Sequence, residues 1–329
     1  MGHALACPQV VSPIRRLGKL KRAPRYGPLG LLILSMALLA SAQAADNKKD
    51  DPNQIGNRDV GKGINFYSLE KEIALGKQLA AEVARQAKIL DDPIISEYVN
   101  RVGQNLARNS DAKVPFTFQV IEADDLNAFA LPGGYVFVNT GLIQMAEEED
   151  EFAGALAHEI AHVAARHSTR RQTQAQLANI STIPLSVLLG GWAGLAARQA
   201  AGALVPMTFL TFSRKDEAEA DYLGLQYLYA AGYDPAGEIS ILEKLGALNR
   251  QKPGTVSRLF STHPMDSDRI QNAEAEIQKI LPARTEYVVT TSEYHDMRQR
   301  VFAVEARRKP DEPDNRPHLV KPPGNQHEQ

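Results

Sequence analysis

Hydrophobic and polar positions follow two different periods in the first half of the chain, and these periods define the expected elements. Apolar residues at helical spacing predict a helix over residues 69–87 and another that opens at Asp92–Pro93. Alternation over residues 116–121 predicts a strand, and residues 135–138 predict a second strand after a turn at Leu131–Gly134. This part of the chain therefore combines helices with a small sheet.

Helical spacing dominates the second half. An acidic run at residues 147–151, which we interpret as a solvated helix cap, leads into a long helix expected over about residues 152–176. Further helices are expected over about residues 214–231, 235–249, 264–280 and 297–307. The pattern predicts one α+β domain over residues 61–307, mostly helical with a small β-sheet.

The two ends of the chain differ from this domain. Residues 1–44 contain no acidic residue and carry six basic ones, followed by an apolar stretch and small residues up to Ala44. This order is typical of a secretory signal peptide, and the apolar stretch is roughly half the ~20 residues of a spanning helix. We expect cleavage after Ala44 and, in a bacterium, a periplasmic protein; a retained anchor is the alternative. Residues 45–60 are expected to form a flexible linker, and residues 308–329 a disordered tail.

Composition narrows the class of protein. The 329 residues are 43% apolar and 23% charged, with a net charge of −2, as in a folded globular protein. Near-neutral charge argues against a nucleic-acid partner, which usually requires a basic face. Cys7 is the only cysteine, so no disulfide or thiolate metal site forms within one chain.

The expected long helix contains the motif His158-Glu159-Ile160-Ala161-His162. Residues four apart share a helix face, so His158 and His162 can present two imidazoles to one Zn²⁺ ion. Glu159 lies one step round the helix, where it can act as general base on water at the metal. Small apolar neighbours indicate a buried helix, in which these polar groups are costly without a metal or other partners. The motif therefore predicts one zinc ion per chain.

A third metal ligand is expected on the helix that begins near residue 214. Glu217 and Asp221 share a face, so Glu217 can bind zinc while Asp221 hydrogen-bonds the free nitrogen of a ligand histidine. Glu219 lies roughly 200° from Glu217 and should face solvent. His167 lies about half a turn from His158, so we expect it at the surface. An acidic helix exposed to water is the alternative interpretation.

Together these motifs resemble the HtpX, Ste24 and BepA group of gluzincin zinc metallopeptidases. The resemblance runs from about Ser68 to about Ile280 and includes Asn127–Gly134, Ala155–Ala157, Ser213–Arg214, Glu217 to Asp221, and Thr262–Pro264 with Arg269. It implies a zincin-like fold in which His158, His162 and Glu217 bind zinc and Glu159 is the catalytic base.

The same resemblance implies that His263 and Arg269 lie near the metal. There they could stabilise the charge that develops on the carbonyl oxygen. His263 could instead be a fourth zinc ligand that closes the site until it swings away. The alternative without a catalytic role is that His263 only begins a helix and that Arg269 forms a surface ion pair.

Gly133, Gly134, Tyr135, Val136 and Phe137 are expected to bind substrate. A peptide added to the edge of this strand would be held by main-chain hydrogen bonds, which tolerate many sequences. The two glycines would let the backbone approach closely, or they simply make a tight turn.

Residues 177–212 are rich in Ala, Gly and Leu, and Arg198 is their only charged residue. Pro184 interrupts the apolar part, which is too short to span a membrane. We interpret the segment as a lid over the active site or an amphipathic helix in peripheral contact with a membrane or client. An ordinary core helix is the alternative.

The expected reaction is hydrolysis of internal peptide bonds in polypeptide substrates. The BepA-type resemblance implies misfolded or stalled envelope and outer-membrane proteins as substrates. BepA-type members also carry a C-terminal tetratricopeptide repeat domain, which we do not expect in this chain. The alternatives are an autoinhibited protease that acts mainly as a chaperone-like assembly factor, gated by His263, and a structural factor without zinc.

Overall fold

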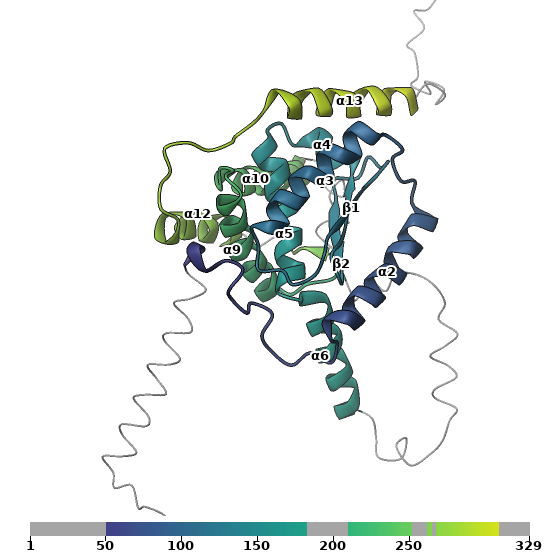
Figure 1. Ribbon diagram of the computed structural model, residues 1–329, viewed down its shortest axis with the longest axis vertical. Helices are drawn as coiled ribbons and strands as arrows, with labels where there is room; N and C mark the ends of the chain where they lie inside the picture. The colour runs from purple at the N-terminus through teal and green to yellow at the C-terminus, as the bar shows by residue number, and fades with distance from the viewer. Residues whose placement is uncertain (1–50, 183–209, 252–261, 265–267, 309–329) are drawn as a thin grey trace, which may run out of the picture. The chain divides into compact units, whose positions relative to one another are not determined.

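The computed structural model describes residues 51–182, 210–251, 262–264 and 268–308 (Figure 1). The helical elements are η1 (Pro52–Gln54), α2 (Leu69–Gln86), α3 (Pro93–Arg108), α4 (Thr140–Met145), α5 (Glu149–Ala164), α6 (His167–Thr182), α9 (Arg214–Ala230), α10 (Ala236–Gln251), α12 (Asp268–Ile280) and α13 (Ser292–Arg308). The strands are β1 (Thr117–Ile121), β2 (Ala128–Leu131) and β3 (Tyr135–Asn139). The expected α+β class, mostly helical with a small sheet, is confirmed. The expected signal peptide, most of the apolar segment at 177–212 and the tail beyond residue 308 lie outside the described residues.

Local sequence signals fix the starts of three helices. Ser68 caps α2 by accepting a hydrogen bond from the backbone of Lys71, and Asp92 caps α3 with Pro93 in its first turn. Ser213 caps α9 together with Asp216, whose carboxylate accepts from the Ser213 backbone. The third of these caps sets the register of the helix that was expected to carry a metal ligand.

Strand β3 lies in the middle of the sheet, whose order is β1-β3-β2. It pairs in parallel with β1 and antiparallel with β2, so its backbone is bonded on both sides. The expectation that Tyr135, Val136 and Phe137 form a peptide-binding edge is therefore wrong, and β2 is the edge strand next to α5. Gly133 and Gly134 form the β2–β3 turn with φ of 75° and 91°, a conformation that favours glycine.

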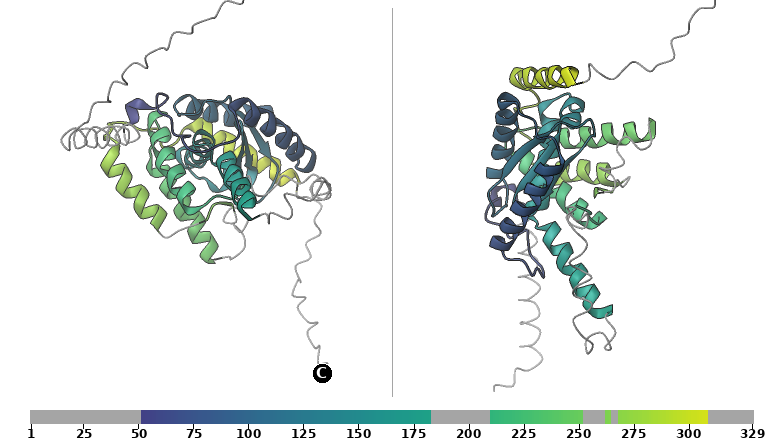
Figure 2. Two further views of the ribbon diagram at one scale, coloured as in Figure 1. Left: turned by 90° about the horizontal axis from the view of Figure 1, so that it is seen from below. Right: turned by 90° about the vertical axis from the view of Figure 1, so that its right-hand side faces the viewer.

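Helix α5 occupies the centre of the domain. It packs against α9 and α10, and also against α3 and β2. The right-hand view of Figure 2 shows the blue helices α2 and α3 on one side and the green helices α9, α10 and α12 on the other. Helix α13 lies across α3 and α4, as Figure 1 shows. This packing buries α5 and its motif on nearly every side.

Residues 51–60 correct the expectation of a flexible linker. Arg58 is 4% exposed and forms a buried ion pair with Asp111 at 2.6 Å. Arg58 also donates to Gln226 on α9, and the Gly56 backbone donates to Asp111. This part of the segment is therefore held against the domain by a buried charge pair.

The expected long helix over residues 152–176 is two helices. The chain leaves α5 at Ala165, and Arg166 adopts a φ of 59°, the left-handed region that a non-glycine residue rarely occupies. Arg166 is held there by an ion pair with buried Glu72 and a hydrogen bond to the Tyr67 carbonyl. Helix α6 then starts in a new direction at His167.

Candidate metal centre

Helix α5 presents two imidazoles toward one point. Nε2 of His158 and Nε2 of His162 lie 3.0 Å apart, and both side chains are buried. The apolar residues beside them on α5 are fully buried. The neighbouring apolar positions are Leu156, Ala157, Ile160 and Ala161.

Helix α9 supplies a carboxylate to the same point. The Oε2 atom of Glu217 is 3.5 Å from Nε2 of His158, and its Oε1 atom is 3.4 Å from Nε2 of His162. Glu217 has no exposed surface, and its Oε2 atom accepts no hydrogen bond from the described residues. A buried carboxylate that converges on two imidazole nitrogens in this way fits a metal ligand.

His263 completes a set of four donors. Its Nδ1 atom is 3.1 Å from Oε1 of Glu217 and 3.3 Å from Nε2 of His158. Ligand atoms of His158, His162, Glu217 and His263 all lie within 4.8 Å of one another, and all four residues are buried. Nitrogen and oxygen donors in this number are those that zinc prefers, so the residues present fit the ion.

A further layer of charge lies behind His158. Its Nδ1 atom is 3.0 Å from Asp221 and 3.9 Å from Glu238. Arg269 donates from Nε and Nη2 to Asp221 at 2.7 and 2.6 Å, and its Nη1 atom is 3.0 Å from Glu217. The guanidinium thus contacts two buried carboxylates, and Glu238 is a third carboxylate beside His158; a bound cation would offset part of their negative charge.

Burial and neighbouring charges set the protonation of His158 and His162 differently. Burial holds the pKa of His162 well below its ordinary value, so this side chain is a neutral imidazole with a free lone pair. Burial also acts to lower the pKa of His158, but its carboxylate neighbours, Asp221 first, outweigh burial and raise it. A metal at Nε2 of His158 competes with that proton.

Glu159 points into the adjoining pocket. Its Oε1 atom is 3.5 Å from Nε2 of His263, and its Oε2 atom has no hydrogen-bond partner among the described residues. Burial raises the pKa of Glu159, whereas the charges of His263 and His158 act against that rise. Glu217 differs, because His263 and its other histidine neighbours outweigh the effect of burial and hold its pKa well below the ordinary value.

His167 is the clearest correction at the site. We expected a surface residue, but His167 is fully buried, and its Nδ1 atom is 2.9 Å from Nδ1 of His162. Its Nε2 atom is 3.2 Å from Glu219, which was expected to face solvent alone. The helical-wheel argument failed because it assumed one continuous helix through Arg166.

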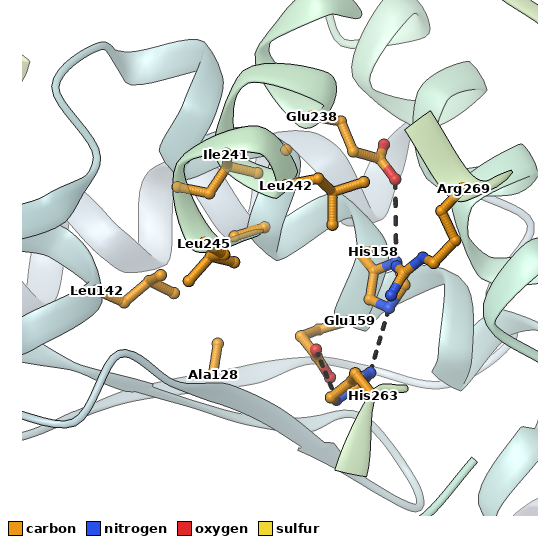
Figure 3. A pocket seen from close by; sticks show the side chains of 12 residues that line it. Ala128, Leu142, His158, Glu159, Glu238, Ile241, Leu242, Leu245, His263 and Arg269 are labelled. Atoms are coloured by element: carbon orange, nitrogen blue, oxygen red, sulfur yellow. Dashed lines mark hydrogen bonds and ion pairs between the residues drawn. The ribbon is translucent and has the colours of Figure 1, made fainter. Parts of the chain in front are cut away.

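A pocket opens beside the donor atoms. Figure 3 shows apolar side chains on one side of the pocket and the charged groups of the centre on the other. The apolar side is formed by Ala128, Leu142, Ile241, Leu242 and Leu245, and the polar side by His158, Glu159, Glu238, His263 and Arg269. A ligand in this pocket would therefore contact the general-base candidate and an apolar surface at once.

The structure brings most of the predicted site residues together. The exceptions are Gly133 to Phe137, since Val136 and Phe137 are buried in the central strand. Glu238 was missed, although a signal for it exists. It precedes Ile241, Leu242 and Leu245 at helical spacing, so it lies on the face of α10 that turns inward.

None of the described helices combines the length and apolar character needed to cross a membrane.

Comparisons with known proteins agree on one family. The model of Peptidase family M48 matches residues 93–277. A beta-barrel assembly-enhancing protease of Yersinia pestis is 31% identical over 69% of this chain and 48% of its own length. A putative beta-barrel assembly-enhancing protease of Vibrio cholerae is 31% identical over 86% of this chain and 58% of its own. Mitochondrial metalloendopeptidase OMA1 of Schizosaccharomyces pombe is 34% identical over 60% of this chain and 57% of its own length.

The chain spans about half the length of the curated relatives it matches. The matched region nonetheless contains the sheet, both helices that carry the donor residues, and His263 with Arg269. Since the family model covers more than half of the sequence, the chain belongs to peptidase family M48.

Proposed function

We propose that the chain is a zinc-dependent metalloendopeptidase of the bacterial cell envelope. One observation carries the proposal: four buried donors from His158, His162, Glu217 and His263 converge within 4.8 Å beside Glu159. Membership of a peptidase family gives the reaction class. The convergent donor set and the membership of a peptidase family therefore support the same chemistry.

The chemistry assigned to Glu159 is general acid–base catalysis. A zinc ion held by the donor set supplies Lewis-acid polarisation of the peptide carbonyl and of water. Glu159 accepts a proton from the attacking water and delivers it to the peptide nitrogen as the carbon–nitrogen bond breaks. The products are a carboxylate and a free amine. Burial raises the pKa of Glu159, which strengthens it as a base.

We assign different roles to Arg269 and His263. Arg269 is engaged by Asp221 and Glu217, so it holds these carboxylates in place rather than contacting substrate. Nε2 of His263 has no hydrogen-bond partner among the described residues and lines the pocket, so it is the better candidate for stabilising charge on the carbonyl oxygen.

Substrate is proposed to bind along β2 in place of the strand first expected. β2 pairs with β3 on one side, and its residue Ala128 lines the pocket that contains Glu159. A peptide bound there would place one side chain against Leu142 and Leu245, which favours an apolar residue next to the cleaved bond. Profiling a peptide library with Leu245→Ala tests this, because the enlarged pocket should accept bulkier apolar residues than the wild type.

The proposed substrates are misfolded or stalled envelope and outer-membrane proteins. Two relatives are named beta-barrel assembly-enhancing proteases, and that name is the support for this part of the proposal. Export depends on the expected signal peptide at residues 1–44.

A second candidate function is an autoinhibited protease that acts mainly as a chaperone-like assembly factor. The position of His263 within the donor set favours it, because a fourth protein ligand would leave no open position on a four-coordinate zinc ion. His263→Ala separates the two functions: faster casein cleavage identifies a gate, and slower cleavage identifies a catalytic group.

The direct test is proteolysis of casein and of an unfolded outer-membrane barrel protein by the purified chain. Wild type should cleave both, lose activity to a chelator and recover it with zinc. Glu159→Gln should cleave at least ~100-fold more slowly, as expected for loss of a general base. Equal cleavage by wild type and Glu159→Gln would contradict the proposal.

A further inference from the structure

A buried imidazole pair extends from the metal centre away from the substrate pocket. His167 has no exposed surface, and its Nδ1 atom faces Nδ1 of His162 at 2.9 Å. Its Nε2 atom faces Oε2 of Glu219 at 3.2 Å, and Arg170 lies 3.5 Å from the same oxygen. We propose that His167 and Glu219 form a relay that fixes the tautomer and orientation of His162. The proposal rests on the proposed function, because it concerns a zinc ion bound through Nε2 of His162.

The proton positions in this relay follow from the roles of the atoms. A neutral imidazole that offers Nε2 to a metal carries its proton on Nδ1, so His162 donates from Nδ1. The facing Nδ1 of His167 must then accept, which places the proton of His167 on Nε2. That proton points to the Glu219 carboxylate, an acceptor. One set of tautomers therefore satisfies both hydrogen bonds.

Packing leaves His162 little other freedom. Phe212 stacks on its ring with centroids 3.9 Å apart and planes 24° apart. Because His167 is fully buried, a water molecule is poorly placed to replace it as the acceptor. The ring plane of His162 is thus set by Phe212, and the direction of its Nδ1 proton is set by His167.

The two ligand histidines are held by different partners. His158 donates toward a carboxylate directly, since its Nδ1 atom is 3.0 Å from Asp221. His162 reaches a carboxylate only through a second imidazole. Helix α9 supplies both carboxylates, Asp221 on one face and Glu219 on another, so the same helix orients both ligands.

The left-handed turn at Arg166 creates the relay. In a continuous helix, a residue five positions after His162 would lie about 140° round the axis and could not face it. The φ of 59° at Arg166 redirects the chain, and the Glu72 ion pair holds this conformation. Left-handed backbone is strained for a residue other than glycine, and the placement of His167 against His162 accounts for this strain at Arg166.

The relay is tested by zinc affinity, measured by competition with a chelating indicator, for wild type and four variants. His167→Leu should bind zinc about 10–100-fold more weakly, as for loss of a group that orients a ligand. His167→Asn should recover part of the affinity, because its side-chain oxygen can accept from His162. Glu219→Gln should lose less zinc affinity than His167→Leu. His295→Leu removes an exposed histidine and should match wild type.

Thermal unfolding of the metal-free proteins separates orientation from folding. His167→Leu should melt within a few degrees of wild type, since leucine suits a buried position. Unchanged zinc affinity in His167→Leu would overturn the relay while leaving the proposed function intact. Equal weakening in the Leu and Asn variants, with a large loss of metal-free stability, would also overturn it. Absence of zinc binding by wild type would instead contradict the proposed function.

Discussion

At the scale of single residues, the acidic run before α5 shows how position changes the meaning of a charge. We expected a solvated cap, but Glu149, Asp150 and Glu151 are all buried. Tyr233 donates to Glu149 at 2.9 Å, and Lys244 forms an ion pair with Glu151 at 2.8 Å. The Asp150 side chain forms no ion pair or side-chain hydrogen bond with the described residues, and burial, reinforced by nearby carboxylates, raises its pKa to about 7.

Replacement of Asp150 should therefore affect stability in a pH-dependent way. Its pKa is raised on folding, so the native state holds a proton that the unfolded state releases between about pH 4 and pH 7. Wild-type stability should fall across this window as pH rises. Asp150→Asn should match wild type near pH 4 and exceed it by about 1–3 kcal/mol at pH 8. Chemical denaturation at both pH values measures this, and a variant less stable at pH 8 would refute the assignment.

At the scale of elements, nearby residues predicted three helix starts, but they did not predict the end of α5. Ser68, Asp92 and Ser213 are local caps whose effect depends on the next few residues. The turn that follows α5 instead depends on Glu72, which lies 94 positions from Arg166 and forms an ion pair with it. The sequence pattern predicted β1 and β3 but missed β2. The central position of β3 depends on long-range pairing, which the pattern does not contain.

The crossing of α5 and α10 offers a prediction at this scale. A Cβ atom on Gly154 would lie 2.8 Å from the Cα atom of Glu238, which is backbone and cannot move alone. Gly154→Ala should therefore separate the two helices and destabilise the protein by about 1–3 kcal/mol, although alanine favours a helix by about 1 kcal/mol. It should also weaken peptide cleavage, because α10 forms the apolar side of the pocket. A stability equal to wild type would show that the helices can adjust.

At the scale of the whole molecule, helical spacing in the sequence predicted most of the candidate metal centre. Five residues could be found this way, because those on the same helix have fixed relative positions. They are His158, Glu159 and His162 on α5, and Glu217 and Asp221 on α9. The contact between His167 and Glu219 could not be found this way, because it depends on the turn at Arg166 and on tertiary packing. The anchoring of residues 51–60 is another such feature, and composition alone indicated a linker there.

Arg58 tests whether this anchor stabilises the domain. Arg58→Met leaves the buried carboxylate of Asp111 without its ion-pair partner, which should cost about 3–5 kcal/mol. Adding Asp111→Asn removes the stranded charge and should restore part of the loss. Equilibrium unfolding in urea gives both values. If Arg58→Met alone were as stable as wild type, residues 51–60 would not be part of the folded unit.

The central claim, a zinc centre built from α5 and α9, is tested most directly by elemental analysis of the purified protein. Wild type and Glu159→Gln should each contain one zinc ion per chain, because Glu159 is not a ligand. Glu217→Ala should contain much less, because it lacks the carboxylate that faces both imidazoles. A well-folded wild type without zinc after incubation with the metal, or full zinc content in Glu217→Ala, would contradict the account.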